Sequence, residues 1–211
     1  IDAVGLDLHE GFDATRMSIL EAVGREVDMV LSHPPYAWII RYSGSQWGEE
    51  PVPGDLSHIE DYDEFLDALQ AVMLNQREAT RRGGVYGTIV GDVRHKGNYY
   101  SLQADLMQRL PRNELRSVII KAQWNIGSGG KEYGRMRYPW VTHEYVVLWE
   151  KLTAEPFAVF ARLAAQNDRH LKGTWRAVVR HALLRAGGRA DLQTLYATLS
   201  EGATSKIAAN P

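Results

Sequence analysis

The sequence predicts an α/β protein in which helices pack on a mostly parallel sheet that ends in an antiparallel hairpin, followed by a helical module. Short apolar runs alternate with helix-like stretches up to residue 92, which is the strand–helix–strand order of a parallel sheet. The apolar runs 118–124 and 143–149 are joined by a Gly/Ser-rich loop without helical periodicity, so these two strands should pair antiparallel.

The composition is that of a globular chain without membrane spans or disulfides. Its 211 residues fit a domain over residues 1–150 and a smaller module over residues 151–211. No apolar run approaches the roughly 20 residues that cross a bilayer, and no segment has the pattern of a secretion signal. The absence of cysteine excludes disulfides and thiolate metal sites. We therefore expect a cytoplasmic protein without a membrane partner.

Charge is divided unevenly along the chain. Residues 151–211 hold nine Lys and Arg against four Asp and Glu, a balance of +5, which leaves −7 for residues 1–150 out of the total of −2. Residues 156–166 and 175–185 are predicted helices, and Asp191 is the predicted N-cap of a third. Basic helices around a turn indicate a helix-turn-helix or winged-helix module that binds DNA. The alternatives are a solvated surface, or an extension that packs on the sheet or on a second subunit of a homodimer.

The first elements are predicted to be a strand, a helix and a second strand. Residues 3–8 form an apolar run that contains Asp7, and an acid at the end of such a strand can bind ribose hydroxyls. The alternative is that Asp7 caps the next turn. A helix over residues 14–25 ends at Gly24, and a short buried strand follows at residues 29–31.

The second strand stops at Ser32-His33-Pro34-Pro35-Tyr36. Proline fixes φ and lacks an N–H, so the two prolines make a stiff turn with free carbonyl groups. Tyr36 then stands at the carboxyl end of the strand, where open α/β sheets bind their ligands. The alternative is a proline turn that closes an ordinary strand and leaves Tyr36 on the surface.

The segment His33-Pro34-Pro35-Tyr36 resembles the catalytic tetrapeptide of DNA methyltransferases that act on the exocyclic amine of adenine or cytosine. These enzymes have a Rossmann-like sheet and use S-adenosyl-L-methionine. The resemblance implies that residue 33 and the Pro34 carbonyl accept hydrogen bonds from the target amine. It also implies that Tyr36 stacks on a base flipped out of duplex DNA. His33 departs from the usual Asp, Asn or Ser, and a neutral imidazole fills that role only in the right tautomer.

The same resemblance implies roles for residues outside the tetrapeptide. It assigns Asp7, Ser32 and His33 to binding of S-adenosyl-L-methionine. The residues that it assigns to the target base and its pocket are Asp92 at the end of the predicted strand 85–92, Arg94 just after it, and His143 at the start of strand 143–149. The alternative for Asp92 is a structural ion pair with Arg94 or Arg41.

Aromatic residues follow the tetrapeptide in a stretch rich in Gly and Pro. Trp38 and Tyr42 either close over a flipped base, since aromatic faces stack on bases, or anchor this loop to the core. A long helix is predicted over residues 60–82, closed by Gly83-Gly84, and a shorter one over residues 102–110.

One motif of the resembling family is absent. Its glycine-rich cofactor loop, similar to Asp-Pro-Phe-x-Gly-Ser-Gly-Thr, does not occur in this chain, and residues 127–130 do not follow the strand that it requires. We therefore expect the chain to be a fragment whose cofactor loop precedes Ile1. His9, Glu10 and Asp13 match no standard spacing of metal ligands, so no metal is expected.

The resemblance favours methyl transfer from S-adenosyl-L-methionine to DNA, at adenine N6 rather than cytosine N4. Two alternatives remain at the level of sequence. A methyltransferase acting on RNA or on a protein glutamine amide uses nearly the same tetrapeptide. A non-catalytic DNA-binding or scaffold protein derived from a methyltransferase is favoured by His33 and by the absent glycine loop.

Overall fold

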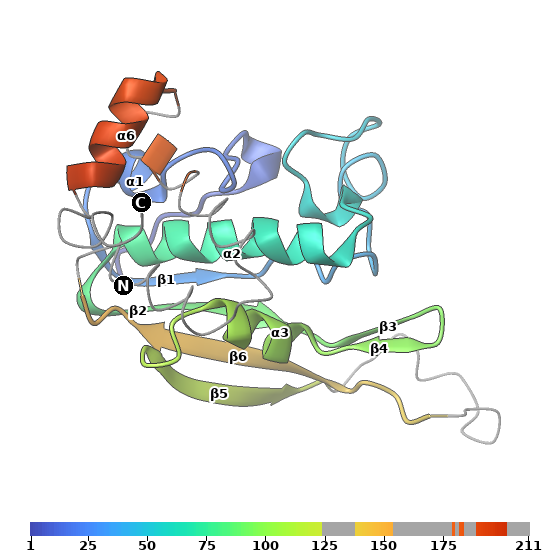
Figure 1. Cartoon of the computed structure of the whole chain (residues 1–211). Coiled ribbons are helices and arrows are strands. Elements are labelled where there is room, and N and C mark those ends of the chain that lie inside the picture. The colour runs from blue at the N-terminus through green and yellow to red at the C-terminus, as the bar shows by residue number, and fades with distance from the viewer. Residues whose placement is uncertain (124–137, 154–178, 180–181, 184–188, 202–211) are drawn as a thin grey trace, which may run out of the picture.

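The computed structural model describes residues 1–123, 138–153, 179, 182–183 and 189–201. Four strands form the main sheet in the order β1-β2-β6-β5 (Figure 1). Their bounds are β1 Val27–Ser32, β2 Thr80–Val90, β5 Leu115–Ala122 and β6 His143–Glu150. β1 and β2 are parallel, whereas β6 is antiparallel to both of its neighbours. The carboxyl ends of β1, β2 and β5 and the start of β6 therefore lie at one end of the sheet.

The predicted hairpin is confirmed, since β5 and β6 pair antiparallel with Lys121 opposite Glu144. The parallel part of the sheet is smaller than predicted, because the apolar run 3–8 is not a strand. Residues 1–6 have no regular structure, and Leu8–Glu10 forms a 3-10 helix, η1. A strand needs a neighbour that takes its backbone hydrogen bonds, and in the described part of the chain β1 pairs with β2 alone.

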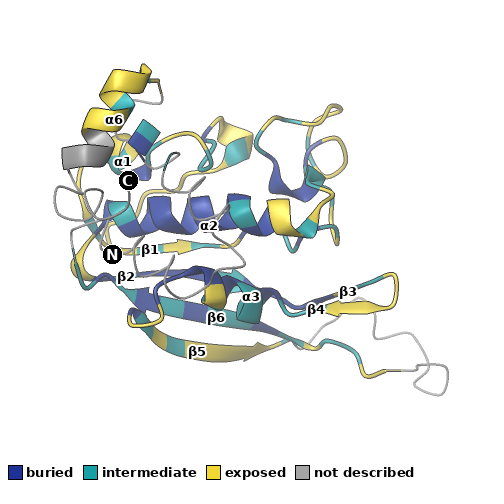
Figure 2. Ribbon diagram, viewed as in Figure 1, coloured by how far each residue is buried: buried dark blue, intermediate teal, exposed yellow. Residues whose placement is uncertain are grey.

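Helix α2 (Tyr62–Ala79) covers one face of the sheet (Figures 1 and 2). Asp61 caps its first turn with its side chain, which satisfies a backbone N–H that has no partner within the helix. Its apolar side chains pack on β2 and β6. The fully buried strand residues of this core are Tyr86, Val90, Val147 and Trp149.

The predicted helix over residues 60–82 is confirmed, but it ends at Ala79 because β2 already begins at Thr80. The pair Gly83-Gly84 therefore lies inside a strand and not at a helix end. A Cβ atom on Gly84 would come within 2.8 Å of the Asp28 carbonyl oxygen. Glycine at this position lets the backbones of β1 and β2 approach closely.

Helix α1 (Ile19–Val23) begins later than predicted. The Asp13 carboxylate accepts hydrogen bonds from the backbone N–H and the hydroxyl of Thr15, and this holds the preceding residues in a turn. The helix starts only after the Ser18 cap. Gly24 ends it as predicted, with a φ of 75° that favours glycine.

The predicted helix over residues 102–110 is confirmed as α3 (Leu102–Arg109), one residue shorter than predicted. The hairpin of β3 (Val93–His95) and β4 (Asn98–Tyr100) precedes it and was not predicted. Its turn consists of Lys96 and Gly97, with φ of 48° and 84°, which is the conformation of tight two-residue hairpins. The hairpin extends beyond the end of the sheet at which β1 and β2 finish (Figure 1).

The face of the sheet opposite α2 carries exposed apolar side chains in the described part of the chain. Met29 and Leu31 of β1 are 49% and 46% exposed. The strand predicted at residues 29–31 is therefore confirmed, but its predicted burial is wrong for these two side chains. The reason is its place at the edge of the described sheet, where α2 covers only the other face.

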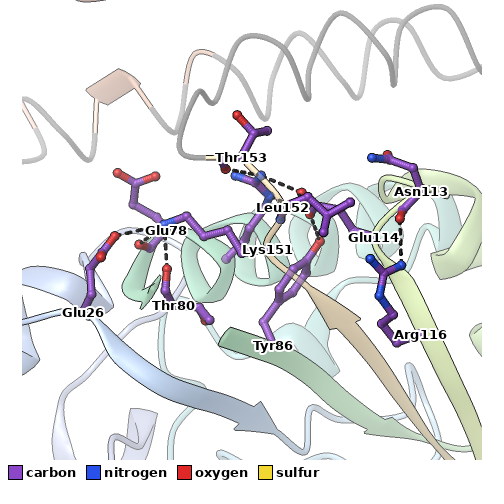
Figure 3. A network of polar contacts seen from close by, with 11 residues as sticks. Glu26, Glu78, Thr80, Tyr86, Asn113, Glu114, Arg116, Lys151, Leu152 and Thr153 are labelled. Atoms are coloured by element: carbon purple, nitrogen blue, oxygen red, sulfur yellow. Dashed lines mark hydrogen bonds and ion pairs between the residues drawn. The ribbon is translucent and has the colours of Figure 1, made fainter. Parts of the chain in front are cut away.

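A buried carboxylate holds the far end of the sheet together, where β6 finishes (Figure 3). Glu114 accepts two hydrogen bonds from the Arg77 guanidinium, at 2.8 and 2.7 Å, and one from the Tyr86 hydroxyl at 2.8 Å. It also accepts the backbone N–H of Leu152 at 3.1 Å. Burial by itself would raise the pKa of Glu114, but the hydrogen bonds and charge of Arg77 outweigh it and hold this pKa below its ordinary value.

Lys151 forms further hydrogen bonds at the same end of the sheet (Figure 3). Its ammonium group is buried and donates to Glu26 at 3.2 Å and to the Thr80 carbonyl at 2.6 Å. Lys151 therefore adds nothing to the exposed positive charge of residues 151–211, although it belongs to that basic segment.

Helix α6 (Leu192–Glu201) confirms the predicted third helix of the C-terminal segment. Asp191 caps it as predicted by accepting the backbone N–H of Thr194 at 2.7 Å. The predicted helix over residues 156–166 lies outside the described residues, as does most of the one over 175–185. None of the described helices combines the length and apolar character that a membrane crossing requires.

Candidate active site

The segment after β1 makes a tight, partly strained turn. Pro34 is buried, whereas His33 before it is exposed. Ala37 is fully buried with a φ of 47°. A left-handed conformation costs a residue with a Cβ atom about 1–2 kcal/mol, and such strain concentrates at functional sites. The turn therefore holds Tyr36 in a fixed orientation at the carboxyl end of β1.

The ring of Tyr36 lies on Gly91, the residue that follows β2. A Cβ atom at Gly91 would come within 2.8 Å of Tyr36 Cε2 and 3.0 Å of Cδ2. Val90 pairs with Tyr145 in the β2–β6 ladder, so the register continued by one residue places Gly91 opposite Glu144. Residues directly opposite each other project to the same face of a sheet. Tyr36 and Glu144 therefore meet on one face.

The hydroxyl of Tyr36 contacts an imidazole. Its oxygen lies 2.6 Å from His33 Nε2. Burial raises the pKa of Tyr36, and the hydrogen bond and negative charge of Glu144 raise it further, with a smaller contribution from Tyr42. The Tyr36 hydroxyl therefore keeps its proton throughout the physiological range, and Tyr42 lies close enough to act on it.

Glu144 is an acidic residue on this face of the sheet, and it is only 6% exposed. Lys121 donates to one carboxylate oxygen at 2.5 Å and Gln123 to the other at 2.7 Å. Burial would raise the pKa of Glu144, but the hydrogen bonds of Lys121 and Tyr36 and the charge of Lys121 lower it below its ordinary value. Glu144 is therefore a carboxylate at neutral pH.

A second polar group surrounds Asp92, on the side of the sheet that faces α2. The Asp92 carboxylate accepts the Tyr99 hydroxyl at 2.7 Å and the hydroxyls of Ser101 and Tyr145 at 3.4 Å. Tyr145 in turn lies 2.8 Å from His143 Nε2. The structure thus links Asp92 and His143 through Tyr145. Burial and the charge of Asp92 raise the pKa of Tyr145.

Arg94 lies beside this second group but does not form the predicted ion pair with Asp92. Its guanidinium stacks over the rings of Tyr99 and Tyr138, at 5.4 and 4.7 Å from their centroids. Arg41 binds Glu60 and a backbone carbonyl instead. Among the described residues, the Asp92 carboxylate accepts hydrogen bonds from hydroxyl groups and has no arginine partner. The ion-pair alternative for Asp92 is therefore wrong.

Trp38 makes the contacts of a loop anchor. Its indole N–H donates to the Glu60 carbonyl at 2.9 Å, and its ring packs on His95, Tyr62 and Tyr100 with centroids 4.9–5.7 Å apart. These contacts tie the loop after Tyr36 to α2 and to the β3–β4 hairpin.

The residues predicted to bind S-adenosyl-L-methionine are not assembled into one site. Asp7 caps η1 by accepting the His9 N–H at 2.7 Å, and its prediction as a strand-end residue is wrong because residues 1–6 form no strand. The Ser32 hydroxyl donates to Thr88 at 3.1 Å and ties β1 to β2. Of the three, His33 alone lies in the group around Tyr36. In the described residues no cluster of three metal-binding side chains occurs.

Sequence reasoning gave no role of their own to four members of these groups, namely Glu144, Lys121, Gln123 and Tyr145. The signal was present in part, because alternation along strand 143–149 places residues 144 and 145 on opposite faces. Which face meets Tyr36 depends on the register between β2 and β6, and the sequence does not give that register.

Comparison with known proteins gives matches among solved structures. No family model and no curated protein matches this chain. One matching structure is a protein of Thermus thermophilus provisionally described as a DNA modification methylase, with 24% identity and a TM-score of 0.42 over 65% of this chain and 51% of that chain. The same protein in complex with S-adenosyl-L-methionine matches with 27% identity and a TM-score of 0.43 over 67% and 54%. The chain spans about half the length of these structures.

Proposed function

We propose that this chain binds the exocyclic amine of a DNA base, adenine N6 in preference to cytosine N4, for methylation by S-adenosyl-L-methionine. The observation that carries the proposal is the fixed turn at the carboxyl end of β1. There His33, the Pro34 carbonyl and the Tyr36 ring come together beside the parallel strand β2. The antiparallel hairpin that finishes the sheet agrees with the resemblance of the tetrapeptide.

The proposed chemistry of the turn is polarisation and positioning. An aromatic amine is a weak nucleophile, and hydrogen bonds from its N–H groups to His33 and the Pro34 carbonyl increase electron density on its nitrogen. Pro35 keeps the turn rigid because its φ is fixed. Tyr36 stacks on the flipped base and holds the amine in line for transfer. S-adenosyl-L-methionine supplies the electrophilic methyl group when bound.

Further contacts to DNA are proposed at the same end of the sheet. The group of Asp92 and His143 offers acceptors and donors near the target base, and Arg94 on the adjoining hairpin brings positive charge for phosphates. Tyr42 lies near Tyr36 and is proposed to contact the flipped base. We propose residues 1–150 as the methyltransferase-like domain and residues 151–211 as a helical DNA-binding module.

The described residues do not fit the cofactor as the resemblance implies. The Asp7 carboxylate is engaged in capping η1, and the Ser32 hydroxyl in bonding Thr88. No role toward S-adenosyl-L-methionine is therefore assigned to these two residues. This observation favours a second candidate function, in which the protein binds DNA without methylating it.

A transfer assay with the full-length natural protein tests the proposal. Radiolabelled S-adenosyl-L-methionine is offered with duplex DNA, RNA of the same sequence, or a glutamine-containing peptide, and cofactor binding is measured by calorimetry. Label in the DNA supports the proposal, and label in RNA or peptide alone moves the substrate to that class. DNA binding without cofactor binding supports the second candidate. If the protein binds neither DNA nor cofactor, both candidates are wrong.

A further inference from the structure

We propose that the β3–β4 hairpin binds the sugar-phosphate backbone of DNA, and that Arg94 holds a phosphate there through its planar guanidinium. The choice of DNA as the partner rests on the proposed function, which this site deepens by naming the element that contacts the backbone. The hairpin extends beyond the end of the sheet at which β1 and the tetrapeptide lie (Figure 1). A DNA strand that delivers a base to Tyr36 would therefore pass beside it.

The two faces of the hairpin have different surroundings. Residues directly opposite each other in an antiparallel pair project to one face, and successive residues alternate between faces. Arg94 pairs with Tyr99, so these two share a face, and His95 and Tyr100 lie on the other. The rings of His95 and Tyr100 pack on Trp38, with centroids 4.9 and 5.1 Å from it. One face thus anchors the hairpin, and the other is turned outward, where Tyr99 is 49% exposed (Figure 2).

Arg94 is an exposed cation on the outward face. Its guanidinium lies over the rings of Tyr99 and Tyr138, at 5.4 and 4.7 Å from their centroids. None of the ion pairs between described residues includes Arg94. An aromatic ring attracts the face of a guanidinium, whereas the N–H groups lie in its plane. Contact with the rings therefore leaves these donors available to an anion.

The ring under Arg94 is itself fixed. The Tyr99 hydroxyl donates to the buried carboxylate of Asp92 at 2.7 Å. Asp92 directly follows Gly91, the residue on which the Tyr36 ring lies. Arg94 is therefore held against a surface that is attached to the turn of the candidate active site. A guanidinium that is already oriented loses less freedom when it binds than a mobile side chain does.

A phosphate is the anion that fits this arrangement. The planar fork of a guanidinium donates two parallel hydrogen bonds to two phosphate oxygens. Lys96 adds a second positive charge at the exposed tip of the hairpin. In DNA each base is flanked by phosphates, and contacts to them fix the position of the protein on the duplex. The hairpin would thus hold the backbone while the tetrapeptide receives the base.

Four variants of the full-length protein test this site by fluorescence anisotropy with labelled duplex DNA. Arg94→Gln removes the charge and the fork, Arg94→Lys keeps the charge alone, and Tyr99→Leu removes a ring under the guanidinium. The matched control is Arg82→Gln, which removes an exposed arginine near the start of β2, at the opposite end of that strand. Circular dichroism checks the fold of each variant.

We expect the Kd to rise about twentyfold in Arg94→Gln, the size of a hydrogen bond to a charged group. The slope of log K against log salt should fall by about 0.9, the contribution of one phosphate. Arg94→Lys and Tyr99→Leu should keep that slope, with a rise of about fivefold, because one bond of the fork or its orientation is lost. Arg82→Gln should bind like the parent.

The opposite results would overturn the phosphate site. An unchanged Kd in Arg94→Gln would do so, as would an Arg94→Lys protein that binds as tightly as the parent, since any positive charge would then suffice. Equal losses in Arg94→Gln and Arg82→Gln would show an effect of overall charge and not of this hairpin. Tighter binding of RNA of the same sequence would overturn DNA as the partner.

Methyl transfer by the parent separates this inference from the proposed function. A parent whose affinity for DNA depends on Arg94 but which transfers no methyl group leaves the phosphate site standing and refutes the proposed function. A parent that methylates DNA with an affinity that Arg94→Gln does not change refutes the phosphate site and leaves the proposed function standing.

Discussion

The ring of Tyr36 occupies the space in which a side chain at position 91 would lie. A Cβ atom on Gly91 would stand 2.8 Å from Tyr36 Cε2, closer than carbon atoms pack. Two residues that are 55 positions apart in the chain thus determine where the Tyr36 hydroxyl meets His33.

Gly91→Ala should displace the Tyr36 ring. We expect overpacking to cost about 1–3 kcal/mol of unfolding free energy, measured by urea denaturation, together with loss of the hydrogen bond between His33 and Tyr36. Gly5→Ala is the control, because nothing lies within 4 Å of a Cβ atom there. Equal stability of the two variants would show that the ring moves aside without cost.

His33 should be replaceable by an acceptor but not by alanine. His33→Asn keeps an acceptor for the target amine and should retain methyl transfer, whereas His33→Ala should lose about 1–3 kcal/mol of transition-state stabilisation. Rates of methyl transfer by the parent and both variants are the measurement. A His33→Ala protein as fast as the parent would remove His33 from the chemistry.

The pair of Arg77 and Glu114 should dominate the stability of the far end of the sheet. Both side chains are almost fully buried, so Glu114→Gln leaves an uncompensated cation and should cost about 3–5 kcal/mol of unfolding free energy. Arg25→Ala removes the exposed pair with Asp2 and should change that free energy by less than about 1 kcal/mol. Urea denaturation of both variants is the test, and similar losses would contradict the role of burial.

Stability should fall in acid because two carboxylates have lowered pKa values. Glu114 and Glu144 are more acidic in the folded protein than their ordinary value of 4.5. The unfolded chain therefore binds protons first, and the stability that both groups provide above this value is lost as the pH falls below it toward their folded pKa values. The unfolding free energy measured from pH 6 downward should show the loss, and Glu114→Gln should reduce its slope.

The C-terminal charges should control the salt dependence of DNA binding. Each phosphate contact contributes roughly 0.9 to the slope of log K against log salt, so Arg176→Gln with Arg180→Gln should flatten that slope. Lys151→Met is the control, because Lys151 is buried and bonded to Glu26 and should leave the slope unchanged. Titrations of duplex DNA at several salt concentrations decide the matter. A slope unaffected by the arginine changes would assign this segment a structural role.

Much of the secondary structure follows from signals that lie close together in the sequence. The i, i+3, i+4 spacing gave helix α2, Gly24 ended α1, and Asp191 began α6, because caps and amphipathic faces depend on residues within a few positions. The absence of a helical pattern between residues 124 and 142 likewise gave the antiparallel pairing of β5 and β6. The stiff turn at Pro34-Pro35 also follows from a local signal, because proline fixes its own φ.

The environment of that turn was decided by contacts between distant segments. Asp7 stands in the sequence like a strand-end acid, yet residues 1–6 have no strand beside them and Asp7 caps η1 instead. Glu144 looks like any strand residue, and the β5–β6 register makes it the partner of Lys121. The sequence by itself determined that His33 and Tyr36 would follow a strand at a rigid turn, since proline acts locally. Only the tertiary structure decided that the Tyr36 ring lies on Gly91 and that its hydroxyl meets His33, because strand register and ring packing depend on backbone and side-chain contacts across the whole sheet.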